Sequence, residues 1–168
     1  MNVCKDNHNP PSVDVTIKTS SGVINSATVS ERCGDDSVCI IPFGTTLKVD
    51  TNLNLGALVV RGTVEWNDDT QATESAYLCA GYVAIEGNGK WDMDLQAKKA
   101  YIYIKDNGAV HDNLHSRAFG SHAATASDYP MIDINGRELV RTWSLLLNPI
   151  RSGDNKIALM HNAHFMGW

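Results

Sequence analysis

Short apolar runs, separated by glycine, asparagine and aspartate, follow one another along most of the chain. They read VCIIP, TLKVD, ALVVRG, TVEW, YVAIEG, KWDM, YIYIKDNG, MIDING, ELVRTW and KIALM. No segment combines the apolar spacing of an amphipathic helix with the residues that cap helix ends. The pattern therefore predicts many short β-strands and little helix.

Several runs place an aliphatic residue shortly before a glycine, and this pairing indicates a repeat. The pairs are Val60 with Gly62, Ile85 with Gly87, Ile104 with Gly108, and Ile134 with Gly136. Successive pairs are roughly 20 to 30 residues apart, an irregular period typical of solenoid coils with loops of variable length. We expect the glycines to supply turns with positive φ between the strands.

Within the runs every second residue is aliphatic, and we expect that residue to face a common core. The expected inward residues are Leu58, Val60, Val83, Ile85, Ile102, Ile104, Ile132, Ile134, Ile157 and Leu159. The expected outward residues are Val59, Ala84, Tyr103, Asp133 and Ala158. Parallel stacking of the runs would place Val60, Ile85, Ile104 and Ile134 in register in one column.

The predicted fold class is all-β, and the first interpretation is a parallel β-helix, or solenoid, of about six coils. An antiparallel β-sandwich also uses many short strands and is the open alternative. Asn107-Gly108 and Asn135-Gly136 are typical of two-residue hairpin turns, which favour the sandwich. Patterning alone does not decide between the two folds.

Composition and charge narrow the function classes. The chain has 168 residues, of which 43% are hydrophobic and 20% charged, as in one globular domain. A net charge of −5 without a Lys/Arg cluster argues against nucleic-acid binding. No apolar run approaches the roughly 18 residues that a membrane span needs, so no membrane insertion of this segment is expected.

The start of the chain bears on where the protein is found. The N-terminus MNVCKDNHNPPS lacks the apolar core of a signal peptide. We expect a fragment of a longer secreted protein from which the signal has been removed.

Four cysteines, Cys4, Cys33, Cys39 and Cys79, allow three pairings if all are oxidised. Cys33 and Cys39 flank the short polar stretch GDDSV, which favours a disulfide between them, and free buried thiols are the alternative. The spacing typical of a zinc site is absent. A disulfide would indicate an extracellular or lumenal compartment.

Four phrases resemble those of the G8 domain, in the family's order. They are GDDSVCIIPFGTTLKVD (34–50), LGALVVRGTVEW (55–66), GYVAIEGNGKWDM (81–93) and IDINGRELVRTWSLL (132–146). Two departures stand out: Asn135 replaces the family's usual histidine before glycine, and a long polar loop separates Ile104 from Ile132.

The resemblance carries expectations about fold and function. It implies a right-handed parallel β-helix over residues 29–168, truncated at its C-terminal end, with residues 1–28 as an N-terminal segment or cap. G8 domains occur in polyductin-like proteins and in cell-surface and secreted proteins that degrade hyaluronan. The resemblance therefore implies an extracellular or cell-surface module that binds a glycan or a protein, or has a structural role.

Two alternative functions stay open. One is an enzyme, or part of one, that cleaves a hyaluronan-like polysaccharide in the manner of a hydrolase. The other is a structural unit that self-associates through the open ends of the β-helix, because unpaired strand edges recruit further strands.

The long loop is the expected place for a binding site, since long loops on rigid scaffolds often carry function. The ligand-binding candidates are His111, Asp112, His115, Arg117 and His122, together with Trp66, whose ring could contact a sugar. His111, His115 and His122 are also weak metal-site candidates, against the alternative of a solvated polar loop. No cofactor is predicted, and a divalent cation, calcium or zinc, is the one open possibility.

Outward carboxylates are the weak candidates for catalysis. They are Glu65, Asp92, Asp94 and Asp133. Neighbouring coils are about 4.8 Å apart, so carboxylates at matching positions could meet the separation that glycoside hydrolysis needs. Outward Asp and Glu also cover the walls of any coil that faces water, and this is the favoured interpretation.

Overall fold

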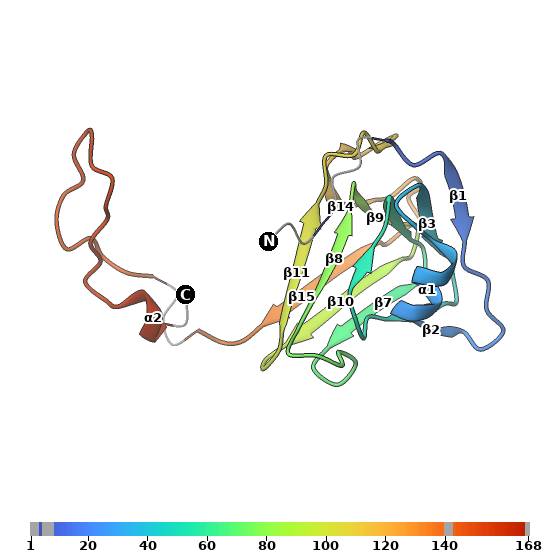
Figure 1. Cartoon of the computed structure of the whole chain (residues 1–168), viewed down its shortest axis with the longest axis horizontal. Helices are drawn as coiled ribbons and strands as arrows, with labels where there is room; N and C mark the ends of the chain where they lie inside the picture. The colour runs from blue at the N-terminus through green and yellow to red at the C-terminus, as the bar shows by residue number, and fades with distance from the viewer. Residues whose placement is uncertain (1–3, 5–8, 140–142, 167–168) are drawn as a thin grey trace. The chain divides into compact units, whose positions relative to one another are not determined.

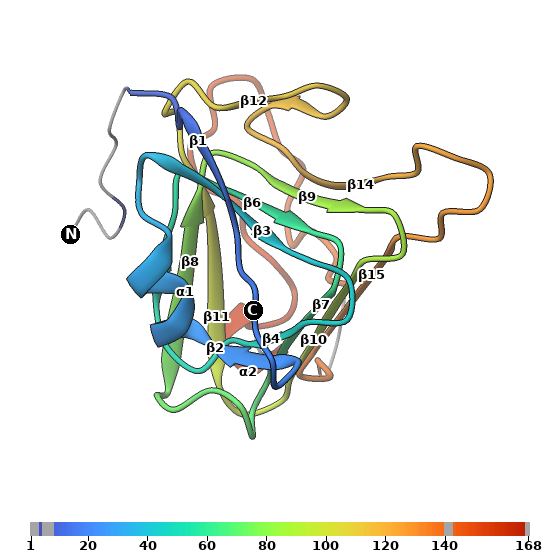
Figure 2. The same cartoon turned by 90° about the vertical axis from the view of Figure 1, so that its right-hand side faces the viewer.

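The computed structural model describes residue 4 and residues 9–139 and 143–166. It divides the chain into two compact units, Met1–Gly136 and Arg137–Trp168. The first unit consists mainly of short strands in three parallel sheets, and the strands of each sheet lie side by side in Figures 1 and 2. The chain therefore belongs to the all-β class, as predicted.

The strands of the first unit fall into sheets that we call A, B and C. Sheet A contains, in spatial order, β1 (Val13–Thr16), β3 (Ser37–Ile41), β6 (Ala57–Val60), β9 (Val83–Glu86) and β14 (Phe119–His122). Sheet B contains β15 (Met131–Gly136), β10 (Lys90–Leu95), β7 (Thr63–Asn67), β4 (Thr46–Lys48) and β2 (Val23–Asn25). Sheet C contains β11 (Lys99–Ile104), β8 (Ser75–Ala80) and β5 (Leu53–Asn54).

Every described ladder within these three sheets is parallel. The antiparallel sandwich is therefore wrong. The hairpin signal at Asn107-Gly108 misled because this turn leads into a small antiparallel pair, β12 (Val110–His111) with β13 (His115–Ser116), outside the three sheets.

Two short helices complete the described elements, α1 (Ser26–Arg32) in the first unit and α2 (Ala163–Met166) in the second. Asn25 caps α1, because its side-chain oxygen accepts a hydrogen bond from the Thr28 amide at 3.0 Å. No helix in the described part of the chain is long and apolar enough to cross a membrane.

Of the three pairings in the predicted column of aliphatic residues, one is confirmed and two are wrong. Val60 and Ile85 are partners in sheet A, as expected. Ile104 instead pairs with Ala80 in sheet C, and Ile134 pairs with Met93 in sheet B. The aliphatic-glycine pair recurs in all three sheets, so its spacing does not tell one sheet from another.

The strand that follows β9 in sheet A is β14, which lies inside the segment expected to be a long loop. Its sequence, FGSH, has no aliphatic alternation and so gave no strand signal. Only one of its side chains, Phe119, packs against the main core.

Inward residues from all three sheets form the main core. Leu58, Val60, Val83 and Ile85 are buried there as predicted. Ile132 and Ile134 are 37% and 51% exposed, because β15 is the last strand of sheet B and has no described strand beyond it.

The outer face of sheet A is covered, which corrects the prediction for Val59 and Ala84. Both are buried in a second apolar cluster with Ala57, Tyr82 and Ala109. Leu114 and Ala118, from the segment after β11, pack against this cluster. Tyr103 and Asp133 are exposed as expected.

The corners between sheets A and B use glycine in two different ways. Gly87 has a φ of +60°, as predicted for a turn glycine. Gly62 and Gly89 are needed for space instead: a Cβ atom on Gly62 would collide with the Thr45 carbonyl oxygen, and one on Gly89 with that of Val60.

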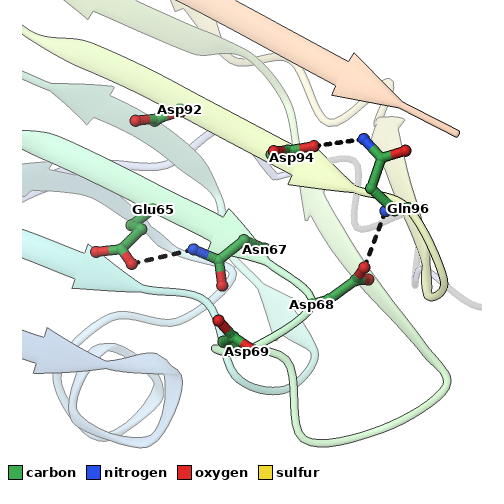
Figure 3. A pocket seen from close by; sticks show the side chains of 7 residues that line it. All are labelled: Glu65, Asn67, Asp68, Asp69, Asp92, Asp94 and Gln96. Atoms are coloured by element: carbon green, nitrogen blue, oxygen red, sulfur yellow. Dashed lines mark hydrogen bonds between the residues drawn. The ribbon is translucent and has the colours of Figure 1, made fainter. Parts of the chain in front are cut away.

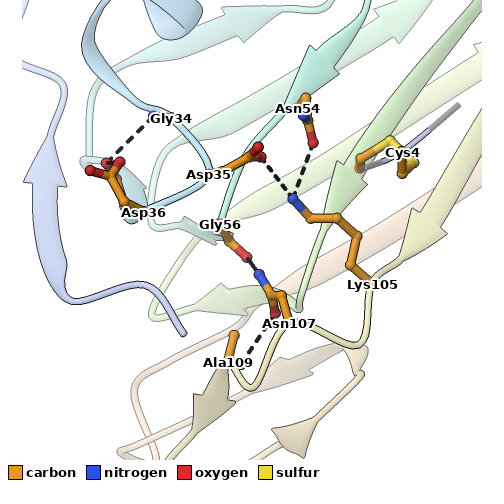
Figure 4. A network of polar contacts seen from close by, with 11 residues as sticks. Cys4, Gly34, Asp35, Asp36, Asn54, Gly56, Lys105, Asn107 and Ala109 are labelled. Carbon is orange, nitrogen blue, oxygen red and sulfur yellow. Dashed lines mark hydrogen bonds and ion pairs between the residues drawn. A yellow bond between two sulfur atoms is a disulfide. The ribbon is translucent and has the colours of Figure 1, made fainter. Parts of the chain in front are cut away.

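A buried polar network ties the segment after β11 to earlier segments of the chain (Figure 4). The Lys105 ammonium contacts Asp35 Oδ1 at 3.0 Å and donates to Asn54 Oδ1 at 3.1 Å. Asn107 donates to the Gly56 carbonyl at 2.8 Å and accepts from the Ala109 amide at 3.2 Å. The network explains one aspartate of the GDD phrase, because Asp35 neutralises a buried lysine.

Both possible disulfides are formed within the first unit. Cys33 pairs with Cys39, as predicted, and Cys4 pairs with Cys79. The alternative of free buried thiols is therefore wrong. Two disulfides fit an oxidising compartment.

The second unit contains the last two predicted runs. Leu146 and Leu159 form an antiparallel bridge, supported by hydrogen bonds from Leu147 to Ala158 and from Met160 to Leu145. Ile157 is exposed and so does not face a core as predicted. Residues 140–142 of the run ELVRTW lie outside the described residues.

Candidate functional site

The outer face of sheet B carries a groove lined mainly by carboxylates and amides (Figure 3). We call it the acidic groove, and its volume is about 480 Å³. Its lining residues are Glu65, Asn67, Asp68, Asp69, Asp92, Asp94 and Gln96. Three of the four predicted catalytic candidates, Glu65, Asp92 and Asp94, are thus brought together.

Strand alternation places these side chains on the outer face. In β7, Val64 and Trp66 point into the core, so Glu65 and Asn67 face outward. In β10 the inward residues are Trp91, Met93 and Leu95, and Asp92 and Asp94 alternate with them.

Because the strands are parallel, outward acidic and amide side chains of neighbouring strands lie opposite one another. Asp92 lies opposite Glu65 on β7 and opposite Asp133 on β15. Asp94 lies opposite Asn67 and Asn135. Asp133 continues the carboxylate column beyond the lining of the groove, where Asn135 donates to it at 2.9 Å.

Each groove carboxylate on β7 and β10 already has a polar partner. Asn67 donates to Glu65 at 3.1 Å, and Gln96 donates to Asp94 at 2.7 Å. Lys90 pairs with Asp92, and Lys48 lies 3.9 Å from Glu65. These contacts orient the carboxylates and offset part of their charge.

Asp68 shapes the end of the groove. It accepts hydrogen bonds from the backbone amides of residues 96, 97 and 98, each at 2.9 Å. These bonds, led by the one from Lys98, hold the pKa of Asp68 below its ordinary value despite the opposing effect of burial. Asp68 thus fixes the loop between β10 and β11 beside the groove.

The groove presents its carboxylate and amide oxygens as hydrogen-bond acceptors on an open polar face. Among the described residues no three His, Cys, Asp or Glu side chains are placed to hold a metal ion. Carboxylate and amide oxygens accept hydrogen bonds, so the groove can accept them from hydroxyl or amine groups of a ligand.

Trp66 is not available to a ligand, which corrects its prediction as a sugar platform. It is fully buried, and its indole N–H donates to Gln71 Oε1 at 2.7 Å. Its ring packs edge-on against Trp91, with centroids 6.4 Å apart. Trp91 also lies in the main core.

The predicted histidine cluster is dispersed. His111 is buried, His115 is exposed at a φ of +63°, and His122 is half-buried on β14. Asp112 is exposed, and Arg117 lies 3.5 Å from Asp106 in an exposed ion pair. These positions do not form a three-histidine metal site.

His111 takes part in a network centred on Glu86. Its Nδ1 accepts hydrogen bonds from the amides of Asn113 and Leu114, at 3.2 and 3.1 Å. The proton of the neutral ring therefore lies on Nε2, which donates to Glu86 Oε1 at 2.9 Å. His111 thus has both ring nitrogens occupied, and it folds the loop onto sheet A.

Glu86 also receives Arg61, whose Nε lies 3.0 Å from Oε2. Burial acts to raise the pKa of Glu86, but the hydrogen bonds from Arg61 and His111 outweigh it and hold the pKa below its ordinary value. Sequence reasoning missed this ion pair. The signal was available, because Arg61 and Glu86 each stand between an aliphatic residue and a glycine of the repeat.

Comparisons with protein-family models, with curated proteins and with solved structures found no match for this chain. The G8 resemblance accordingly stays a prediction that depends on the four phrases alone.

Proposed function

We propose that this chain is an extracellular glycan-binding module of the G8 type, built as a right-handed parallel β-helix. The β-helix is supported by the order in which the chain visits the sheets: A, B and C for β3 to β5, again for β6 to β8, and again for β9 to β11. Parallel strands joined in this way almost always follow a right-handed path. The two disulfides support an extracellular location.

The acidic groove is the proposed ligand site, and the observation that carries the proposal is its regular lining. On β7 a carboxylate, Glu65, alternates with an amide, Asn67. The positions opposite them on β10 are both carboxylates, Asp92 and Asp94. Sugar hydroxyls donate hydrogen bonds to carboxylates, and hydrogen bonds to charged groups are stronger than neutral ones.

The negative charge of the acidic groove favours uncharged glycans over acidic ones. Glu65, Asp68, Asp69, Asp92 and Asp94 would repel a polymer that contains uronic acids, such as hyaluronan. The proposed ligand is therefore an uncharged glycan. Asn67 and Gln96 favour a glycan over a basic protein segment, because an amide both donates to and accepts from hydroxyls, whereas a lysine or arginine needs acceptors alone.

The test is affinity electrophoresis in gels that contain galactomannan, hydroxyethyl cellulose or hyaluronan. We expect retardation by an uncharged polysaccharide and none by hyaluronan. Asp92→Asn with Asp94→Asn should weaken the interaction by about tenfold, because hydrogen bonds to charged groups contribute about 1.5 kcal/mol or more. Asp14→Asn, an exposed position on β1, is the matched control and should leave the retardation unchanged.

Three outcomes would contradict the proposal. Retardation by hyaluronan alone would reverse the charge argument, and loss of polysaccharide length during incubation would favour the enzyme. Binding of a lysine-rich peptide in place of every polysaccharide would favour a protein partner.

A further inference from the structure

A second cavity, of about 440 Å³, lies where sheet A turns into sheet B, and we call it the corner pocket. Successive turns between sheets A and B contribute to it: Phe43 follows β3 and Arg61 follows β6. Glu86 ends β9, Gly87 and Asn88 follow it, and His122 ends β14. Figure 2 shows the turn after β9 and the segment after β14 on the same side of the first unit. Asp128, from the loop that precedes β15, completes the lining.

The charges of the corner pocket are already paired. Arg61 binds Glu86 Oε2 at 3.0 Å, and His111 takes the other oxygen of Glu86. Asp128 Oδ2 accepts from the amides of Ala124 and Thr125, both at 2.9 Å. The pocket therefore has one arginine against two carboxylates and no surplus arginine or lysine to attract an anion, and both carboxylates are held by protein donors.

Several polar groups still have hydrogen-bonding capacity. Asn88 Oδ1 accepts from the Tyr129 amide at 3.0 Å, which fixes the side chain and leaves its NH₂ group as a donor. Arg61 uses Nε toward Glu86, so its two terminal nitrogens can donate elsewhere. Glu86 and Asp128 have further lone pairs that can accept from hydroxyls.

One residue that lines the corner pocket, Phe43, has an aromatic ring that is exposed to solvent. The Phe43 side chain is 82% exposed, although phenylalanine is normally buried. It sits in the turn between β3 and β4, next to Gly44 at a φ of +77°. An exposed ring of this kind offers an apolar surface to the C–H face of a sugar.

We propose that the corner pocket binds one ring of an uncharged sugar, with Phe43 against its apolar face and Arg61, Asn88 and Asp128 on its hydroxyls. A sugar ring combines an apolar face with a rim of donors and acceptors, and the pocket has the matching groups. This inference rests on the proposed function for the ligand class, but it concerns residues that do not line the acidic groove.

The experiment is saturation-transfer NMR with methyl β-D-glucopyranoside, methyl β-D-galactopyranoside and N-acetyl-D-glucosamine as separate probes. We expect saturation to be strongest at the protons on one face of the bound ring. Amide shifts in labelled protein should centre on residues 43, 61, 88 and 128. Phe43→Ala should weaken binding about tenfold, because aromatic contacts to a ligand carry energies of that order.

Phe43→Trp should retain binding, and Tyr101→Ala, at an exposed tyrosine of sheet C, is the matched control that should bind as the unmodified protein does. Because Phe43 is exposed, its replacement should not disturb the fold. Asn88→Ala provides a second variant, which should weaken binding without removing the ring. The proposal is overturned if Phe43→Ala and Tyr101→Ala bind equally, or if the shifts fall elsewhere.

The two sites can fail independently. If Asp92→Asn with Asp94→Asn abolishes polysaccharide retardation while Phe43→Ala leaves the sugar probes bound, only the corner pocket is wrong. If Phe43→Ala loses the sugar probes while Asp92→Asn with Asp94→Asn leaves the polysaccharide retardation unchanged, the acidic groove is wrong as the glycan site and the corner pocket stands.

Discussion

Lys105 is a charged side chain in a place where charges are rare. Its side chain is 1% exposed, and its ammonium contacts Asp35 and Asn54, from two earlier parts of the chain. A buried ion pair adds little to stability over an apolar pair, but removal of one partner leaves an uncompensated charge. The ion pair therefore links the segment after β11 to the GDD phrase at residues 34–36.

The predicted effect of Asp35→Asn is a loss of about 3 kcal/mol in the free energy of unfolding, since the Lys105 ammonium stays buried without its counter-ion. Lys105→Met should cost less, and the double variant should lose less than the sum of the two single losses. Urea denaturation measures all three. Asp36→Asn, at the exposed neighbour, is the control, and an equal loss there would refute the role given to the ion pair.

At the scale of the structural elements, the backbones of successive turns between sheets A and B approach one another closely. The Gly89 amide donates to the Glu86 carbonyl at 2.9 Å, and the Lys90 amide donates to the carbonyl of Gly62, in the preceding turn between sheets A and B, at 2.8 Å. These contacts bring the backbone of one corner against the next, so no side chain fits at Gly62 or Gly89. Gly87, two residues earlier, has open space and a positive φ.

The two glycines of the GNG turn should therefore respond differently to alanine. Gly89→Ala should lower the free energy of unfolding by about 3 kcal/mol, because its Cβ would overlap the Val60 carbonyl oxygen and force the corner to shift. Gly87→Ala should cost about 1 kcal/mol, the strain of a left-handed backbone conformation. Urea denaturation of both variants tests the difference, and a larger loss at Gly87 would contradict the close approach.

At the scale of the whole molecule, two disulfides cross-link the first unit and close loops of very different length. Cys4 and Cys79 are 75 residues apart, whereas Cys33 and Cys39 are 6 apart. A cross-link stabilises a fold largely by restricting the unfolded chain, and the effect grows with the length of the closed loop. The long-range bond is therefore expected to contribute more.

Replacement of Cys4 and Cys79 by serine should lower the free energy of unfolding by about 4 kcal/mol, and replacement of Cys33 and Cys39 by about 2 kcal/mol. Denaturant unfolding without reductant gives both values. Mass spectrometry of a non-reduced digest checks the pairing itself. The reverse order of the two losses would show that loop length is not what decides their contributions.

Local patterns determined the class of fold and part of the site. Alternation along β7 and β10 is a property of any extended strand, so Glu65, Asp92 and Asp94 were correctly expected on one outer face. The Cys33–Cys39 bond was also predictable, because its two ends are close in the chain.

Only the tertiary structure decided which strand meets which. Ile104 and Ile134 carry the same local signal as Val60 but belong to other sheets, since sheet membership depends on the lengths of the turns between strands. Val59 and Ala84 became buried because a distant segment folds over them, and Cys4 reaches Cys79 for a similar reason. Short-range geometry dictates the direction of a side chain, whereas what covers that side chain depends on residues far along the sequence.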